Sequence, residues 1–215
     1  MRFILGPIRN TGRQTVMPET LYDDPFDWFE HWFDEACQTV SANANAMSLG
    51  TVSAEGHPSI RQVLLKGFDA RGFMFYTNYR SQKARELDEN PACALNFYWR
   101  GLERQIRIEG LAHRLSPEES DAYFATRPRG SQVGAWASLQ SRPLANRQVL
   151  AARVEEFEER FHDQPVPRPE HWGGYLVVPL RFEFWEAEAY RLHDRWEFVR
   201  SSVDAEEWQV EMLYP

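Results

Sequence analysis

Apolar and polar residues follow two different periods along this 215-residue chain, and the first change of period lies near residue 46. Over residues 25–40, apolar side chains recur at helical spacing directly after Asp24-Pro25, which predicts a helix. Beyond it, apolar residues alternate with polar ones or form short runs, which indicates strands. We expect strands over 46–53, 59–67, 73–77, 92–99 and 104–115, with one short helix over 81–89 among them.

The helical period returns in the middle of the chain. Ser116-Pro117-Glu118-Glu119 combines a serine cap, a proline at the first helical position and acids in the first turn, so a helix should begin there. We expect helices over 117–126, 131–138 and 143–162, and then closing strands over 174–185, 190–200 and 208–213. This succession predicts a mainly β fold, an antiparallel barrel or strongly bent sheet with helices packed outside it.

Residues 1–22 lack any period and contain several glycines and prolines, so the sequence predicts a mobile N-terminal arm. No repeat or low-complexity segment marks a boundary after this arm. We therefore expect a single domain over residues 23–215. Because 43% of the chain is hydrophobic and 14% is aromatic, it can bury one sizeable core.

The formal net charge of -8 argues against non-specific binding to nucleic acid, since no overall basic field would steer the protein to a phosphate backbone. Any phosphate must be held by a local cluster of cations. No apolar run approaches the ~18 residues that span a bilayer. Cys37 and Cys93 lie in apolar contexts and are expected to be buried free thiols, so we predict a soluble cytoplasmic protein. The six histidines lack metal-ligand spacing, and we expect no metal site.

Four titratable side chains stand within Arg191–Arg195, shortly after the aromatic run Phe182–Trp185. In an extended chain Arg191, His193 and Arg195 would share one face, because side chains alternate along a strand. Two guanidinium groups and an imidazole on one face suit a planar anionic ligand. A solvated edge strand, with Asp194 paired to a neighbouring arginine, explains the same residues equally well.

Two further places combine cations with polar side chains. Arg61 and Lys66 differ by five positions, so they face opposite sides of a regular strand unless a bulge intervenes, or else they serve different partners. Simple solvation of the strand ends is the alternative. Ser81 and Lys83 stand at a predicted helix N-terminus, where unpaired backbone N–H groups favour an anion, although an ordinary serine cap beside an exposed lysine is also consistent.

Two segments could bind the ring or the phosphate of a ligand. Gln105 can both donate and accept hydrogen bonds at the polar edge of a flavin-like ring, although a wet barrel interior would also accommodate it. Tyr123, Arg127 and Ser131 follow one another closely enough to converge on one phosphate dianion. Gln140 and Ser141 come soon after them.

Taken in this order and spacing, these segments resemble the pyridoxamine 5′-phosphate oxidase family from about Asp24 to Pro215. Each segment alone is weak, and their combination is specific. The resemblance rests on Arg61–Lys66, Tyr76–Asn78, Ser81–Lys83, Leu102–Gln105, Arg127–Trp136, Gln140-Ser141, Trp172–Tyr175 and Arg191–Arg195.

The resemblance implies an FMN-binding split β-barrel that works as a homodimer, with two sites at the subunit interface. It implies the following cofactor residues: Arg61, Lys66, Tyr76, Thr77, Ser81, Gln82, Lys83 and Gln105 from one subunit, with Gln140, Ser141, Trp185 and Arg195 from the other. It places the substrate phosphate among Lys66, Tyr123, Arg127 and Ser131, and it makes Arg191 and His193 the catalytic residues that cover the substrate's pyridine ring and reacting carbon.

The activity that the resemblance implies is the oxidation of pyridoxamine 5′-phosphate and pyridoxine 5′-phosphate to pyridoxal 5′-phosphate, with O₂ reduced to H₂O₂. Two alternatives remain. One is a related flavin oxidase of secondary metabolism that acts on a phenazine-type precursor. The other is a non-catalytic carrier of FMN or pyridoxal phosphate.

The chain departs from the family pattern in several places. Gln82 stands where the family often has arginine, and Glu186-Ala187 stands where it usually has glutamine and glycine. Asn43 occupies a position that tends to carry an acid, and the N-terminal arm lacks the usual Arg-x-x-Tyr substrate lid in recognisable form. We expect a weaker FMN phosphate contact at Gln82 and altered surroundings of the flavin at Glu186.

Overall fold

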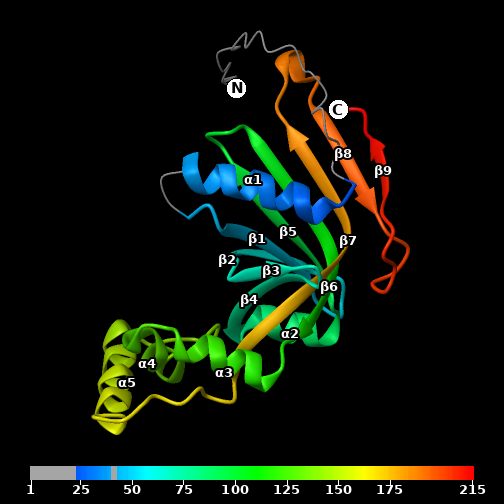
Figure 1. The fold of residues 1–215 in the computed structure, drawn as a ribbon. Coiled ribbons are helices and arrows are strands. Elements are labelled where there is room, and N and C mark those ends of the chain that lie inside the picture. The colour runs from blue at the N-terminus through cyan, green and yellow to red at the C-terminus, as the bar shows by residue number, and fades with distance from the viewer. Residues whose placement is uncertain (1–22, 40–42) are drawn as a thin grey trace, which may run out of the picture. The chain divides into compact units, whose positions relative to one another are not determined.

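The helix predicted after Asp24-Pro25 is α1 (Pro25–Thr39) in a computed structural model that describes residues 23–39 and 43–215 (Figure 1). The arm predicted over residues 1–22 lies outside the described residues. The apolar stripe of α1 is buried as its spacing predicts, with Trp28, Phe29, Trp32 and Ala36 in the core. Cys37 follows Ala36 on the outward side and is exposed, so the prediction that it is buried is wrong, whereas Cys93 is buried as predicted.

The described residues divide into two compact units. Unit 1 contains the described residues up to Ser48 together with Ala94–Glu109 and Pro179–Pro215, and unit 2 contains Leu49–Cys93 and Gly110–Val178. The single domain expected over 23–215 stays a prediction.

Hydrogen bonding joins nine strands into one sheet in the order β2-β1-β5-β6-β7-β4-β3, with β8 paired to β7 and β9 paired to β8. The pairs β3–β4, β4–β7, β7–β8 and β8–β9 are antiparallel. The strands are β1 (Ala46–Val52), β2 (Pro58–Leu64), β3 (Gly67–Asp69), β4 (Gly72–Asn78), β5 (Ala92–Trp99), β6 (Arg104–Arg114), β7 (Trp172–Glu186), β8 (Asp194–Val199) and β9 (Gln209–Met212). The alternating pattern therefore predicted the strands to within a few residues, except that it did not separate β3 from β2 and that it extended the strand β8 over 190–193.

The remaining helices are α2 (Gln82–Glu89), α3 (Pro117–Ala125), α4 (Arg129–Ala137) and α5 (Arg147–Arg160), and a short 3-10 helix spans Ala189–Arg191. Ser116 and Glu119 form a reciprocal capping box at the start of α3, as the sequence predicts. Helix α5 is shorter than the predicted 143–162, because Asn146 caps it by accepting a hydrogen bond from the backbone of Val149. No helix in the described ranges is long and apolar enough to cross a membrane.

Each unit has its own apolar packing. In unit 1, the Trp28 ring stacks on Phe184 at 4.6 Å between centroids and lies 5.3 Å from Trp196. In unit 2, α4 packs along α5 (Figure 1), where Val133 and Ala137 meet Phe157 and Phe161. Many of the aromatic residues of the chain therefore pack in the core, as its composition predicts.

Candidate functional site

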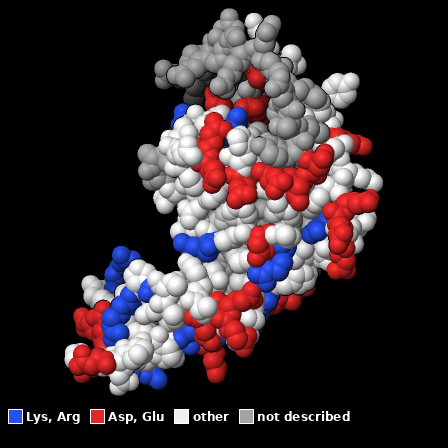
Figure 2. Space-filling model, in the orientation of Figure 1, with Lys and Arg blue, Asp and Glu red and all other residues white. Residues whose placement is uncertain are grey.

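A pocket of about 350 Å³ lies within unit 2, between β4, α3 and α4. Seven residues that the sequence analysis assigns to the site line this pocket, namely Lys66, Tyr76, Thr77, Tyr123, Arg127, Ser131 and Gln140. They come from segments up to 74 positions apart (66 to 140). Figure 2 shows Lys and Arg side chains on the α4–α5 end of the molecule beside acidic ones, so a net negative chain still presents cations locally.

Lys83 is the centre of a polar cluster in unit 2. Its Nζ donates to Gln140 Oε1 at 3.2 Å, to Thr77 Oγ1 at 3.3 Å and to Ser81 Oγ at 3.4 Å. Thr77 Oγ1 also donates to Gln140 Oε1 at 3.0 Å. Burial, together with the nearby charge of Arg61, lowers the pKa of Lys83 to about 8. The ammonium donates its hydrogen bonds to neutral oxygens, and the nearby Glu86 carboxylate only partly offsets the lowering of its pKa. An added anion would therefore favour its charged form.

The side chain of Ser81 does not cap α2, although the sequence leaves an ordinary cap open as an alternative. It is fully buried and faces the Lys83 ammonium. Gln140 contacts Thr77 and Lys83 of its own chain, a contact that the family resemblance does not imply, since it places Gln140 on the partner. Ser141 follows in an exposed left-handed turn with φ 65°.

Arg127 lines the pocket with an unsatisfied nitrogen. Its Nη1 is buried and has no hydrogen-bond partner among the described residues, and burial lowers the pKa of the guanidinium. The guanidinium carbon lies 4.5 Å from the ring centroid of Trp172 and 5.5 Å from that of Phe124. A buried donor without a partner is costly unless a ligand satisfies it, so this nitrogen suits an anionic oxygen.

Three aromatic rings, those of Tyr76, Tyr123 and Trp172, also line the pocket. Tyr76 stacks on Tyr123 at 3.9 Å and on Trp172 at 5.5 Å between centroids. Gly174 makes this possible, because a Cβ there would lie 2.8 Å from Cε1 of Tyr76. Trp172 and Gly174 belong to a quoted family segment, but the sequence analysis gives them no role. The sequence pattern that could have indicated a role for them is a tryptophan directly before two glycines at the start of a strand.

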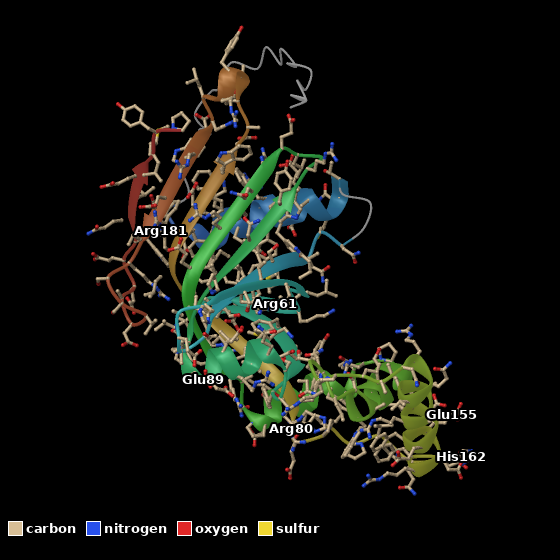
Figure 3. All side chains as sticks on the ribbon, turned by 180° about the vertical axis from the view of Figure 1, so that it is seen from behind. Arg61, Arg80, Glu89, Glu155, His162 and Arg181 are labelled. Atoms are coloured by element: carbon tan, nitrogen blue, oxygen red, sulfur yellow. The ribbon has the colours of Figure 1, made fainter. Side chains whose placement is uncertain are left out.

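Arg61 is bound within its own chain between β2 and α2 (Figure 3). It donates to the backbone of Leu49, to Thr51 and Ser59, and to Glu86 at 3.2 Å. Burial opposes ionisation of Glu86, but hydrogen bonds from Thr51, Ser59 and Gln82 and the charge of Arg61 lower its pKa to about 2. Arg61 is thus paired with Glu86 and does not line the pocket, whereas Lys66 does line it. Gln82 donates to Glu86 at 2.8 Å rather than lining the pocket.

The other predicted cofactor residues lie in unit 1. Trp185 on β7 is in register with Arg195 on β8, and Gln105 lies on β6. Arg195 donates from Nε to Glu183 at 2.8 Å and from Nη1 to the backbone oxygen of Tyr214 at 2.9 Å. Glu183 is 3% exposed and also accepts from Arg107 at 2.8 Å.

The predicted strand over 190–200 is wrong at its start. Tyr190 and Arg191 both have positive φ, at 59° and 65°, and the strand begins only at Asp194. Arg191, His193 and Arg195 therefore do not share one strand face, because two left-handed residues interrupt the extended chain before His193. His193 packs against Trp185 at 4.5 Å between ring centroids, and its Nδ1 accepts the backbone N–H of Glu188 at 3.1 Å.

Glu186, one of the departures from the family pattern, forms an ion pair with Arg104 at 2.8 Å. Arg104 also pairs with Glu35 of α1 at 2.5 Å. The acid at this position thus has a structural partner in unit 1. Asn43, a second departure, has φ 59° and closes the turn into β1 through its backbone oxygen.

The comparisons with known proteins agree with this geometry. Residues 33–161 match the family described as pyridoxamine 5′-phosphate oxidase. Residues 172–215 match the region described as the pyridoxine 5′-phosphate oxidase C-terminal dimerisation region. Together the two matches cover most of the chain.

Two similar proteins are each named pyridoxine/pyridoxamine 5′-phosphate oxidase. One, from Rubrobacter xylanophilus, is 55% identical over 214 residues, which cover 100% of this chain and 97% of the relative. The other, from Bordetella petrii, is 50% identical and covers 94% of this chain and 97% of the relative.

Solved structures extend the likeness to the fold. PhzG from Burkholderia lata 383, in complex with tetrahydrophenazine-1-carboxylic acid, is 30% identical with a TM-score of 0.86, over 94% of this chain and 98% of that one. A pyridoxamine 5′-phosphate oxidase-related, FMN binding protein from Nostoc punctiforme is 18% identical with a TM-score of 0.71, over 89% and 98%. The predicted split-barrel fold, a mainly antiparallel sheet with flanking helices, is thereby confirmed. From the matched regions and the relatives, the chain belongs to the pyridoxamine 5′-phosphate oxidase family.

Proposed function

We propose that this chain is an FMN-dependent oxidase that forms pyridoxal 5′-phosphate. Pyridoxamine 5′-phosphate, O₂ and water would give pyridoxal 5′-phosphate, ammonia and H₂O₂, and pyridoxine 5′-phosphate and O₂ would give pyridoxal 5′-phosphate and H₂O₂. The observation that carries the proposal is the buried Arg127 Nη1, which lacks a partner in a pocket that Lys66, Tyr123 and Ser131 also line. The names of the relatives support the same substrate class.

The residues of unit 2 fit the phosphate of FMN. Lys83 has a pKa lowered to about 8 and contacts only neutral oxygens from Thr77, Ser81 and Gln140, so a phosphate would supply the missing negative charge. FMN, when bound, supplies the redox chemistry by accepting two electrons from the substrate and passing them to O₂. Tyr76 would add a flat apolar surface beside it, and Gln105, Trp185 and Arg195 of unit 1 would complete the set by family resemblance.

Arg127 and Lys66 would bind the substrate phosphate and thereby hold the reacting carbon in place. Binding energy from a group remote from the reaction can fix orientation, which contributes to the rate rather than to affinity alone. Tyr123 and Ser131 would donate their hydroxyl groups to the same phosphate. The stacked Tyr76, Tyr123 and Trp172 rings keep this wall rigid.

His193 would act on the substrate ring as a hydrogen-bond donor. Because its Nδ1 accepts the backbone N–H of Glu188, the neutral imidazole carries its proton on Nε2. It can therefore donate to an oxygen of the substrate from Nε2, while Nδ1 is already occupied. Arg191, exposed in its left-handed turn, would cover the ring beside it.

The two alternatives are less well supported. The Burkholderia lata protein, whose structure holds a phenazine carboxylic acid, is 30% identical to this chain, whereas the two relatives named pyridoxine/pyridoxamine 5′-phosphate oxidase are 55% and 50% identical. Both named relatives above are oxidases, which argues against a non-catalytic carrier.

The test is direct. The purified protein should release FMN on heating, identified by mass spectrometry, and should produce H₂O₂ with pyridoxamine 5′-phosphate in proportion to the pyridoxal 5′-phosphate formed. FAD in place of FMN, or FMN binding without peroxide, would contradict the proposal.

We further propose that the active unit is a homodimer, in agreement with the match of residues 172–215 to a dimerisation region. If each site draws on both chains, mixing Arg61→Ala with Arg195→Ala subunits should restore up to roughly a quarter of the sites. The reason is that half the random dimers are mixed and one of their two sites is intact. No recovery after verified exchange would indicate sites built from one chain.

A cytoplasmic location completes the proposal. Cys37 and Cys93 are both free thiols, as is usual in a reducing compartment. Fractionation of the producing cells with an activity assay would test it, and activity confined to an oxidising compartment would contradict it.

A further inference from the structure

Glu183 is a carboxylate buried in the sheet of unit 1, with only 3% of its surface exposed. It lies on β7 directly opposite Glu197 of β8. Two like charges in register are unfavourable, and a buried carboxylate needs charged partners. The arginines around it must therefore compensate for its charge.

Both oxygens of Glu183 are used. Oε2 accepts from Arg107 Nη1 and Oε1 accepts from Arg195 Nε, each at 2.8 Å. Arg195 is fixed a second time by its bond to the backbone oxygen of Tyr214. With Nε and Nη1 occupied, Nη2 is the nitrogen of Arg195 without a partner in the described part of the chain, and the plane of the guanidinium is set.

The three arginines of this face differ in their partners. Arg107 pairs with both Glu109 and Glu183, and Arg181 (Figure 3) pairs with both Glu109 and Glu197. Arg195 pairs, among the described residues, with Glu183 alone. The orientation of Arg107 and Arg181 would survive the loss of one carboxylate, whereas that of Arg195 depends on Glu183.

We propose that Glu183 is a positioning residue that orients Arg195 toward FMN. The inference rests on the proposed function, in which Arg195 belongs to the cofactor site. Glu183 itself touches no ligand. It holds Nε so that Nη2 is presented for a charge-assisted hydrogen bond.

The experiment measures the Kd of FMN for the apoprotein by quenching of flavin fluorescence. Glu183→Gln has nearly the same shape but cannot accept from both arginines, so the Kd should rise roughly ten- to a hundredfold. Glu197→Gln is the matched control, since it makes the same change on the same face but contacts Arg181 instead. Its Kd should stay close to that of the wild type.

A double-mutant cycle separates positioning from simple stabilisation. In an Arg195→Ala background, Glu183→Gln should raise the Kd no further, because the side chain through which it acts is gone. An equal rise in both backgrounds would show that Glu183 serves the fold alone and would overturn the inference.

Two further outcomes keep the test decisive. If Glu183→Gln does not fold, as judged by its melting curve, Glu183→Asp keeps the charge but withdraws it from Arg195, and a wild-type Kd for that variant would overturn the inference. If the wild-type apoprotein itself does not bind FMN, the proposed function fails, which is a different result from wild-type binding that Glu183→Gln leaves unchanged.

Discussion

The pocket of unit 2 and the charged sheet face of unit 1 use cations in opposite ways. Next to the pocket, Lys83 donates to neutral oxygens of Thr77 and Gln140, two residues that line it. In the pocket, Arg127 has a buried nitrogen without a hydrogen-bond partner among the described residues. On the sheet face, Arg107 and Arg195 each pair with a carboxylate at 2.8 Å. The two regions contain the same residue types but differ in whether negative charge is already present.

This difference distinguishes the ways in which the two regions can act. A cation without a counter-charge is held at a cost that an anionic ligand removes, whereas a fully paired cation gains less from a ligand and serves chiefly to fix geometry. The unit in which a cation lies does not determine whether it is paired, because Arg61 lies in unit 2 and is nevertheless paired with Glu86. We therefore expect the unpaired cations to act by direct attraction of a ligand anion, and the paired cations to act through their fixed orientation.

The largest effect should follow Arg127→Ala. The loss of a charge-assisted hydrogen bond to the substrate phosphate, worth about 1.5–3 kcal/mol, should lower kcat/KM for pyridoxamine 5′-phosphate roughly ten- to a hundredfold. FMN retention should change far less. Steady-state kinetics and the flavin absorbance of the purified variant measure both quantities.

The matched control for Arg127 is Arg129→Ala. Arg129 donates to the backbone oxygens of Phe161 and Gln164, so its loss should lower the melting temperature and leave KM unchanged. If Arg127→Ala is stably folded and keeps the wild-type KM, the assignment of this pocket to the substrate phosphate is wrong.

The next largest effect is expected for Gly174→Ala, which tests the stacked rings of Tyr76, Tyr123 and Trp172. The new Cβ would lie 2.4 Å from Cδ1 of Leu115 and 2.8 Å from Cε1 of Tyr76, so the ring stack must shift. Overpacking of this kind costs about 1–3 kcal/mol in the free energy of unfolding. Chemical denaturation measures it. Gly101→Ala, where nothing lies within 4 Å, is the control, and equal stability of the two variants would contradict the prediction.

The pH dependence of FMN binding should show the lowered pKa of Lys83. The ammonium form predominates below its pKa of about 8, so FMN affinity should be full near pH 7 and should fall as the pH rises through 8. By pH 9 about a tenth of the free protein keeps the charge, which predicts a roughly tenfold higher Kd. The phosphate stays a dianion across this range.

Lys83→Arg should flatten this profile, because an arginine stays charged to much higher pH. Fluorescence titrations at several pH values provide the measurement. A profile of Lys83→Arg that still falls through pH 8 would assign the titration to another group.

The smallest effect should come from Gln82→Arg, which restores the residue common in the family. The new guanidinium would pair with Glu86, which already accepts from Gln82 at 2.8 Å and from Arg61 at 3.2 Å. A partly exposed ion pair contributes up to about 1 kcal/mol, so the Kd of FMN should fall by no more than about fivefold. Titration of the apoprotein with FMN measures this Kd. A tenfold or larger decrease in the Kd would indicate that residue 82 contacts the phosphate directly.

The sequence predicted the regular elements well because their signals are local. Ser116 and Glu119 form a capping box that can be read directly, and the alternating residues of β1, β4 and β5 define their own strands. The turn at Tyr190 and Arg191 could not be predicted in this way. Neither residue favours positive φ, so only the surrounding structure holds them there.

Through a family resemblance the sequence named seven residues that line the pocket, but it did not predict how the polar residues pair. Glu86 reads as an ordinary helix acid, although it binds Arg61, 25 positions away. Gln140 meets Thr77 across 63 positions, and Glu183 reads as a polar position between phenylalanines. Pairing over such separations depends on the folded sheet and leaves no local pattern.

The stacked rings beside Arg127 have an optical consequence. Trp172 is a wall of the pocket rather than a distant core residue, so a bound molecule that absorbs near-ultraviolet light can accept its excitation energy across a very short path. Binding of such a molecule in the pocket would therefore quench the fluorescence of Trp172, one of the eight tryptophans of the chain. Replacing Trp172 by phenylalanine would remove this contribution to the fluorescence change.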